Sequence, residues 1–134
     1  MNFHWIEAFE GQRAVELHDL YSKEWWTKGR SFDDMMRMLK HSDLTLGCCT
    51  ENGKLIGFAR VLTDYTFKAF IFDVIAHESF RGLGVGQRIV KRIFDHETLN
   101  GVRSFELYCP DHIAPFYEKL GFTRSTSSLL VHRH

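Results

Sequence analysis

The segment from residue 67 to residue 94 constrains the fold more than any other part of the chain. It begins with the nearly continuous apolar run FKAFIFDVIA, which predicts a central β-strand covered on both faces, with Asp73 as its one acidic residue. The run leads into RGLGVG, in which Gly82, Gly84 and Gly86 alternate. Apolar residues at helical spacing then predict an α-helix, namely Ile89, Val90, Ile93 and Phe94. The segment therefore predicts a strand, a glycine turn and a helix in direct succession.

A helix that begins directly after glycines offers a site for an anion. The first amides of a helix have no partner within it, and the helix dipole adds partial positive charge there. Glycine at positions 82, 84 and 86 removes the side chains that would keep a phosphate away from the backbone. Compensating positive charge is available from basic side chains in the same segment, namely Arg81, Arg88, Lys91 and Arg92. We therefore predict that this turn holds a pyrophosphate.

The spacing of the glycines distinguishes this turn from two common phosphate-binding motifs. No Gly-Lys-Ser/Thr follows, so the turn is not a P-loop, and glycines at alternate positions do not match the dinucleotide-binding fingerprint. A glycine-rich connection that serves only to make a tight turn is the structural alternative.

Hydrophobic periodicity predicts the remaining elements. Two helices are expected over 12–21 and 32–41, the second with Ser31 as N-cap and Asp34 three residues later. An Asn-Gly turn predicts an antiparallel hairpin between LTLGCC and LIGFARVL. Later, SFELYC predicts a strand, PDHIAPFYEKL a short helix and STSSLLVHR a final strand. The order α-α-β-β-β-α-β-α-β predicts an α/β fold with a mixed, mainly antiparallel sheet flanked by helices, in one domain over residues 1–134.

Composition limits the classes of partner. The 134 residues are 44% hydrophobic and 25% charged, without an apolar run near the ~20 residues of a membrane span. Lys plus Arg and Asp plus Glu number 17 each, so the basic excess typical of nucleic-acid binding is absent. The N-terminus does not resemble a secretory signal and the three cysteines form no CxxC pair, which favours a cytoplasmic protein with reduced thiols. The eight histidines lack metal-ligand spacing with a carboxylate, so no metal is predicted.

Two motifs resemble those of one enzyme superfamily. VIAHESFRGLGVG is similar to the acyl-CoA signature of the GNAT N-acyltransferases, in which Arg/Gln-x-x-Gly-x-Gly/Ala opens a helix, and Arg81, Gly84 and Gly86 take those positions. DHIAPFYEKLGF resembles the later motif of the superfamily through Ala114, Tyr117, Gly121 and Phe122. Both stretches are especially similar to arylalkylamine N-acetyltransferases. The motifs cover about residues 72–122.

The resemblance implies a GNAT-like fold with splayed central strands that form an acyl-CoA cleft. In such enzymes the strand before the glycine turn leaves its neighbour, and its free backbone groups pair with the pantetheine arm. An amide near Val74 or Ile75 could also polarise the thioester carbonyl. Acetyl-CoA is the expected cosubstrate. The residues predicted to bind it are Val74, Ile75, Ala76, Arg81, Gly82, Leu83, Gly84, Val85, Gly86, Gln87, Asp111, Ala114 and Phe116.

The resemblance also implies a general acid. Tyr117 corresponds to the tyrosine that protonates the departing CoA thiolate in many members, and a phenol's ordinary pKa near 10 suits that transfer. A half-buried core tyrosine is the alternative. The paired strand histidines of the arylalkylamine enzymes align with Phe70 and Phe72, so the base must differ. Asp73 or a water relay is the predicted base, with a purely structural role as the alternative for Asp73.

The acceptor is expected to be a small primary amine. Trp26, Asp64, Tyr65 and Phe72 are predicted to contact it, and Asp64 and Tyr65 are also alternatives for the base. Ordinary explanations for the same residues are a solvated turn at 64–65 and a lid anchor at 25–26. The alternative functions are a non-catalytic acyl-CoA sensor and a nucleotide-phosphate binder unrelated to CoA. Neither a nucleic-acid nor a membrane partner is expected, and a homodimer is compatible with families of this kind.

Overall fold

The structure, a computed structural model, describes residues 2–134. Its strands are β1 (His4–Ile6), β2 (Leu44–Cys49), β3 (Leu55–Thr63), β4 (Lys68–Ala76) and β5 (Ser104–Glu106). Its α-helices are α1 (Gln12–Ser22), α2 (Phe32–Lys40), α3 (Val85–Phe94) and α4 (Ala114–Glu118), with short 3-10 turns η1 (Glu78–Phe80) and η2 (Glu97–Leu99). No helix within this range is long and apolar enough to cross a membrane.

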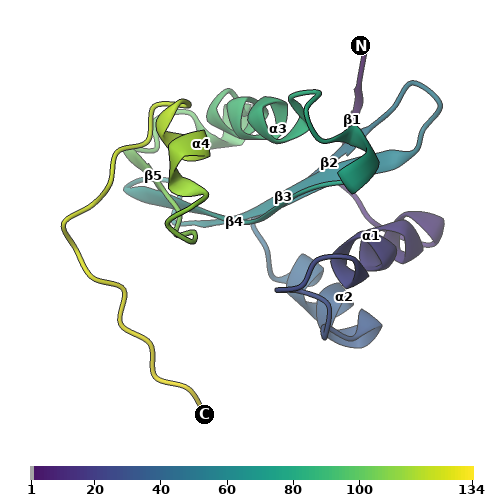
Figure 1. Cartoon of the computed structure of the whole chain (residues 1–134), viewed down its shortest axis with the longest axis horizontal. Helices are drawn as coiled ribbons and strands as arrows, with labels where there is room; N and C mark the ends of the chain where they lie inside the picture. The colour runs from purple at the N-terminus through teal and green to yellow at the C-terminus, as the bar shows by residue number, and fades with distance from the viewer. Residues whose placement is uncertain (1) are drawn as a thin grey trace.

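The strands form one sheet in the order β1-β2-β3-β4-β5. Neighbouring strands are antiparallel except β4 and β5, which are parallel. Helices α1 and α2 cover one face of the sheet, and α3 and α4 lie on the opposite face (Figure 1). The predicted α/β architecture, a mixed and mainly antiparallel sheet flanked by helices, is therefore confirmed.

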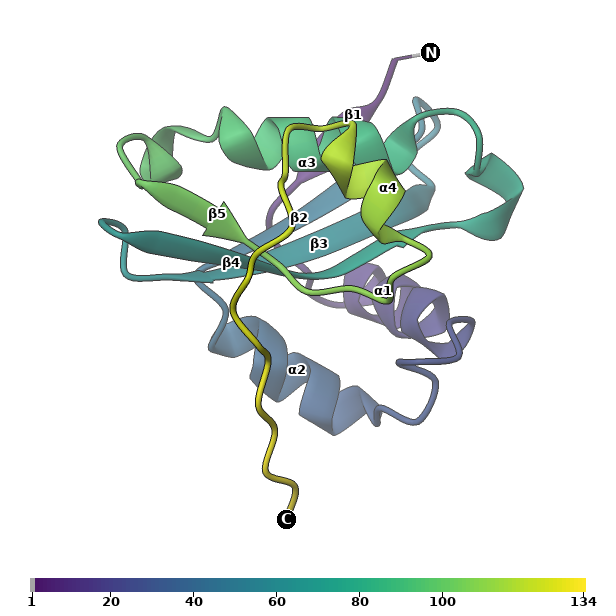
Figure 2. The same cartoon turned by 60° about the vertical axis from the view of Figure 1, so that its left-hand side comes forward.

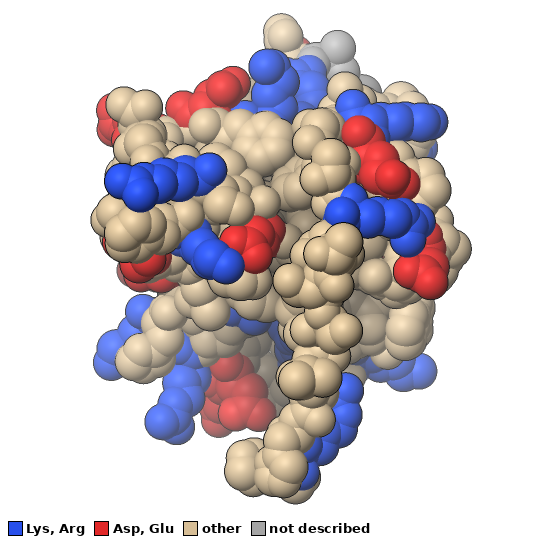
Figure 3. Space-filling model, turned by 90° about the vertical axis from the view of Figure 1, so that its left-hand side faces the viewer, with Lys and Arg blue, Asp and Glu red and all other residues tan. Residues whose placement is uncertain are grey.

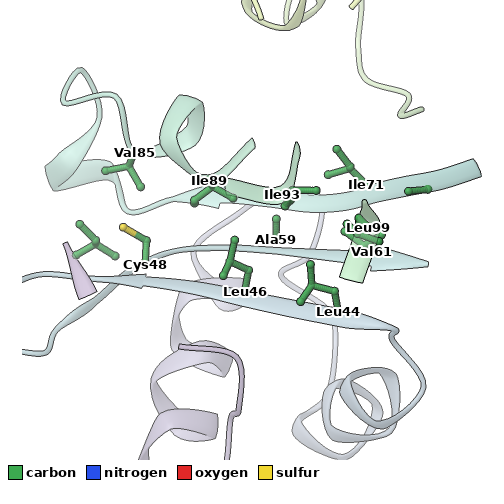
Figure 4. Packing of buried hydrophobic residues seen from close by; sticks show 12 residues of the cluster. Leu44, Leu46, Cys48, Ala59, Val61, Ile71, Val85, Ile89, Ile93 and Leu99 are labelled. Atoms are coloured by element: carbon green, nitrogen blue, oxygen red, sulfur yellow. The ribbon is translucent and has the colours of Figure 1, made fainter. Parts of the chain in front are cut away.

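Helix α3 packs closely on the sheet because small residues face it. A Cβ atom added at Gly57 would lie 2.7 Å from side-chain atoms of both Val85 and Ile89, so only glycine permits this approach. Ile89 and Ile93 are fully buried, and burial of each contributes roughly 2 kcal/mol. Figure 4 shows these side chains lying between α3 and the strands. This packing fixes where the N-terminus of α3, and hence the glycine turn, lies relative to β3 and β4.

A second cluster of buried side chains joins α1 and α2 to the other face of the sheet. Its largest members are Tyr21, Phe58 and Leu17, each fully buried, together with Met35 of α2. The Ser31 hydroxyl caps α2 by accepting a hydrogen bond from the Asp34 amide at 3.1 Å, as the sequence predicted. Both predicted N-terminal helices are confirmed.

Two expectations about strands were wrong or incomplete. The predicted final strand is absent, and its apolar residues Leu129, Leu130 and Val131 are exposed. A serine-rich segment precedes them, and its local hydrogen bond, from the Ser127 amide to the Ser125 hydroxyl, competes with strand pairing. The short strand β1 was not predicted, because three residues carry too little periodicity to recognise.

Candidate active site

The glycine turn leaves the first amides of α3 free. Gly84 is the N-cap of α3 in the left-handed region, with φ 77°, and no side chain caps the helix. Gly82 also has a positive φ of 88°, a conformation that disfavours other residues. Among the described residues, the amides of Val85, Gly86 and Gln87 make no hydrogen bond. The turn therefore has the unpaired donors and the dipole that an anion requires.

Basic residues near this turn differ in where their side chains lie. Arg88 and Arg92 place their guanidinium groups 4.8 Å from the ring centres of Phe3 and Trp5. Lys91 lies 3.7 Å from Asp95 in the next turn of α3. Arg81 is the basic residue that directly precedes the glycine turn.

Arg81 connects the end of β4 to the segment between α1 and α2. Its Nε donates to the carbonyl of Ala76 at 3.3 Å, and its Nη2 lies 2.6 Å from Oε1 of Glu24. The Arg81 side chain is 56% exposed, so one edge of the guanidinium is open to solvent. A diphosphate at the α3 N-terminus would compete with Glu24 for this side chain.

Strand β4 loses its neighbour before it reaches the glycine turn. It pairs with β5 only from Lys68 to Phe70, and β5 ends at Glu106. The chain then leaves the sheet and continues to α4 (Figure 2). From Ile71 to Ala76, β4 has β3 on one side and no strand on the other. The backbone predicted to pair with pantetheine, residues 74–76, lies in this unpaired part.

A β-bulge interrupts β4 at Asp73. Phe58 faces Ile75 and Arg60 faces Phe72, so Asp73 and Val74 together oppose the single residue Ala59. Asp73 takes a left-handed conformation with φ 56°, which Asp tolerates better than most residues. The bulge turns the Asp73 side chain toward α1 and α2.

The Asp73 carboxylate accepts four hydrogen bonds, three of them at Oδ2. Its Oδ2 accepts from the Tyr21 hydroxyl at 2.8 Å, from Arg30 Nη1 at 2.7 Å and from Arg60 Nε at 2.8 Å. Arg30 Nη2 lies 3.4 Å from Oδ1. The side chain of Asp73 is only 6% exposed. These four bonds tie α1, β3 and the segment before α2 to the bulge.

This network has opposite effects on two pKa values. Burial alone would raise the pKa of Asp73, but hydrogen bonds from Arg30 and Arg60, with their charges, hold it below its ordinary value. Burial, and then the Asp73 charge, raise the pKa of Tyr21, which stays protonated. A carboxylate with a low pKa and occupied oxygens is a poor proton acceptor. The role of Asp73 as base stays a prediction, and these contacts favour its structural alternative.

Tyr117 lies in α4 and is 9% exposed. Its ring makes edge contacts with Phe116 and Phe122, at centroid distances of 5.0 and 5.7 Å. Burial, and to a lesser extent the neighbouring Cys109, raise the pKa of Tyr117 to about 12. The phenol therefore keeps its proton throughout the neutral range, as a general acid must.

Helix α4 touches the glycine turn through Phe116. A Cβ atom added at Gly86 would lie 3.2 Å from Cζ of the Phe116 ring, so the two predicted coenzyme contacts are neighbours. Ala114, half-buried, begins the same helix. Asp111 lies before it with a fully solvated side chain, 3.4 Å from Arg124. Ile113, rather than Asp111, is the N-cap of α4.

The predicted acceptor residues do not all lie together. Asp64 and Tyr65 are in the exposed β3–β4 turn, at the opposite end of β4 from the glycine turn. Asp64 Oδ1 accepts the amides of three following residues, and these bonds lower its pKa. Trp26 is 41% exposed in the segment between α1 and α2. Of the four, Phe72 alone lies at the bulge.

Aromatic side chains lie where β4 and β5 separate. The Phe70 and Phe72 rings are stacked, with centroids 6.2 Å apart, and the Tyr108 ring meets Phe72 edge-on at 6.0 Å. Tyr108 and the partners of Asp73 were not predicted as site residues. The sequence offered one signal, since a lone Asp in an apolar strand needs a cation, but it did not indicate which one.

The surface around α4 and the C-terminal segment has no large patch of charge of a single sign. Figure 3 shows acidic and basic side chains interspersed on this face. An open hollow of about 670 Å³ lies here between β5 and residues 120–127. It borders the free edge of β5, where the predicted final strand would have paired, and none of its lining residues is a predicted site residue. We therefore place the candidate site at the glycine turn and the bulge, not in this hollow.

Known proteins are similar in sequence to this chain over most of its length. The model of the GNAT acetyltransferase family matches residues 5–122. An N-acetyltransferase of Pyropia yezoensis, itself uncharacterized, is 31% identical over 123 residues, which are 90% of this chain and 70% of that protein. Serotonin N-acetyltransferase 2, chloroplastic, of Oryza sativa subsp. japonica is 28% identical over 103 residues. Those residues make up 75% of this chain but 52% of the rice protein, so the chain spans about half of that relative.

Solved structures share the fold. A Deinococcus radiodurans R1 protein assigned to the acetyltransferases has a TM-score of 0.81 at 26% identity, over 96% of this chain and 87% of that one. AAC(6')-Iy, in complex with the bisubstrate analogue CoA-S-monomethyl-acetylneamine, has a TM-score of 0.77 over 100% of this chain and 99% of its own. Its identity of 15% shows likeness of fold alone. Because the family model matches residues 5–122, a range that includes both motifs, the chain belongs to the GNAT acetyltransferase family, which uses acetyl-CoA.

Proposed function

We propose that the protein moves the acetyl group of acetyl-CoA to a primary amine. The observation that supports this most directly is the course of β4, whose edge opposite β3 has no paired strand from Ile71 to Ala76 and which leads to the free amides of the glycine turn. An extended pantetheine arm would pair with this backbone, and the diphosphate would bind the amides of residues 85–87. Arg81 would then contact the diphosphate with its exposed edge.

The bulge supplies a donor for the reacting carbonyl. The regular pairing of β4 with β3 is interrupted at Asp73, and we propose that an amide next to this bulge faces the cleft. A fixed amide there would stabilise the oxyanion that forms when an amine attacks the thioester. This proposal keeps Val74 and Ile75 as the residues that hold the acetyl group.

The chemistry is a direct transfer. The lone pair of the neutral amine attacks the thioester carbon, a C–N bond forms and the C–S bond breaks. The amine loses one proton to water, the departing thiolate takes the Tyr117 proton, and the Tyr117 phenolate regains a proton from water. Because the Asp73 carboxylate is buried, has a lowered pKa and accepts three hydrogen bonds at Oδ2, we propose the water relay as the base and assign Asp73 to positioning of the bulge.

The test is release of free CoA thiol from acetyl-CoA in the presence of a panel of primary amines. We expect release that depends on the amine, and a fall of roughly 100-fold in kcat for Tyr117→Phe. Calorimetry on the same variant is the control, because the phenyl ring keeps its contacts and CoA affinity should change less than threefold. Tight CoA binding without transfer to any amine would instead identify a non-catalytic acyl-CoA sensor. A location in the cytoplasm and a possible homodimer stay predictions.

A further inference from the structure

Arg60 holds hydrogen-bond donors that the protein does not use. Its Nε binds Asp73, but among residues 2–134 neither Nη1 nor Nη2 has a protein acceptor. The side chain is only 14% exposed. No fully buried side-chain nitrogen in the described range lacks a partner, so neither of these two nitrogens is fully buried. A guanidinium fork with a free edge fits a carboxylate in two-point geometry.

The charges around Asp73 are unbalanced. Arg30 and Arg60 supply two positive charges against one carboxylate, and Tyr21 stays neutral. One positive charge is therefore uncompensated. It repels an ammonium group and attracts an anion, and the low dielectric near buried groups strengthens both effects.

The free edge of Arg60 lies beside an aromatic wall. Its guanidinium carbon is 4.8 Å from the centre of the Phe72 ring, which stacks on Phe70 and meets Tyr108 edge-on. The wall extends from β4 to the segment after β5, at the point where β4 and β5 separate. Apolar rings and a positive charge therefore lie side by side here.

We infer that the acceptor is an aromatic amino acid, an amine that carries a carboxylate and an aryl group on the same small molecule. This inference rests on the proposed function. The carboxylate binds the Nη edge of Arg60, the ring packs on Phe72 and Tyr108, and the carboxylate offsets the positive charge that would otherwise repel the substrate's ammonium group. The proton and acetyl transfers stay as described above.

Binding of reaction products tests this without any turnover. With CoA-saturated protein, calorimetry compares N-acetyltyrosine with N-acetyltyramine, which differ only by the carboxylate and carry no ammonium. We expect N-acetyltyrosine to bind at least tenfold more tightly, and Arg60→Gln to reduce this ratio below threefold. Arg60→Lys keeps the charge without the fork and should give an intermediate ratio. Arg103→Gln is the matched control, because Arg103 lies 4.9 Å over Phe67 at the other end of β4, and it should leave the ratio unchanged.

The outcomes separate this inference from the proposed function. Equal affinity for the two products, no binding of either, or a ratio that survives Arg60→Gln in folded protein overturns the inference. Transfer of acetyl to tyramine at least as fast as to tyrosine also overturns it, while the N-acetyltransferase function stands. Failure of acetyl-CoA to bind or to transfer to any amine removes the proposed function itself. Far-ultraviolet circular dichroism on each variant verifies that it is folded.

Discussion

Arg81 Nη2 lies 2.6 Å from Oε1 of Glu24, although the two residues are 57 positions apart in the sequence. This ion pair joins the glycine turn to the segment that connects α1 and α2. The Glu24 side chain is 15% exposed and that of Arg81 56%, so the pair lies at the surface with its acidic partner largely covered. Glu24 thus occupies the side chain that a bound diphosphate would attract.

Removal of the Glu24 charge should strengthen coenzyme binding. Glu24→Gln releases Arg81 and removes a carboxylate that repels phosphate, and an exposed ion pair is worth about 0.2–1 kcal/mol. We expect calorimetry to give about two- to fivefold tighter CoA binding at low salt. Glu106→Gln, which removes the Lys68–Glu106 pair at the other end of β4, is the matched control and should leave the affinity unchanged. Weaker CoA binding in Glu24→Gln would show that Glu24 orients Arg81 instead of competing with the diphosphate.

Replacement of Asp73 should destabilise the protein. Asp73→Asn leaves two guanidinium groups without a counter-charge, and loss of one partner from a buried pair costs about 3 kcal/mol. Urea unfolding at pH 7 measures this loss. Asp95→Asn, which removes an exposed pair with Lys91, should change the free energy of unfolding by less than about 0.5 kcal/mol. A similar small change for Asp73→Asn would contradict the role given to the network.

The same carboxylate should make stability depend on acid. The pKa of Asp73 is depressed in the folded protein, so its stabilising effect is present above its unfolded pKa near 3.9. That stabilisation disappears as the pH falls through the lower folded value. Urea unfolding from pH 6 to pH 2.5 should therefore show a steeper loss of the free energy of unfolding in the wild type than in Asp73→Asn.

The Asp73 carboxylate should not be needed as a base. In folded Asp73→Asn at low temperature, kcat should stay within about tenfold of wild type, since water serves as the base.

Deprotonation of Tyr117 should not lower the activity up to pH 10. Burial and Cys109 raise the pKa of Tyr117 to about 12, so its phenol keeps its proton up to pH 10. Below that value kcat should rise with pH, because more of the amine is neutral, and should then reach a plateau. A decline of kcat near pH 10 that disappears in Tyr117→Phe would show that the phenol titrates at its ordinary pKa.

No cysteine should be needed for transfer. Burial raises the pKa of Cys109, which leaves little thiolate at neutral pH, and Cys48 and Cys49 are buried in the core. Cys109→Ser should keep kcat within about threefold of wild type. A loss of activity with trapping of acetyl on Cys109 in the wild type, measured by mass spectrometry, would establish a covalent route in place of direct attack.

Local patterns predicted the elements that local forces determine. The strand, glycine turn and helix from residue 68 to residue 94 follow from apolar periodicity and from Gly82 and Gly84, whose positive φ angles few other residues tolerate. The Ser31 cap and the Asn-Gly hairpin follow for the same reason. STSSLLVHR also has a local strand pattern, but no neighbouring strand binds it, and pattern alone does not provide one.

The partners of Asp73 could not be predicted in this way. Tyr21, Arg30 and Arg60 come from three other parts of the chain, 52, 43 and 13 residues away. No spacing rule links them, and any of the 17 basic residues could have served. The bulge that brings them together has one sequence signal, an Asp inside an apolar strand, because Asp tolerates the left-handed conformation. The ion pair between Glu24 and Arg81 escaped prediction for the same reason, although Arg81 itself was predicted to bind the coenzyme.

Calorimetry of CoA binding to Gly86→Val tests most directly whether the glycine turn holds the diphosphate. Gly86 has no positive φ, so the added side chain meets the Phe116 ring and blocks the turn without backbone strain. Gly29→Val is the control, since a Cβ atom at Gly29 meets nothing within 4 Å. We expect at least tenfold weaker CoA binding to folded Gly86→Val and unchanged binding to Gly29→Val. Equal CoA affinity in the two folded variants would contradict diphosphate binding at the glycine turn.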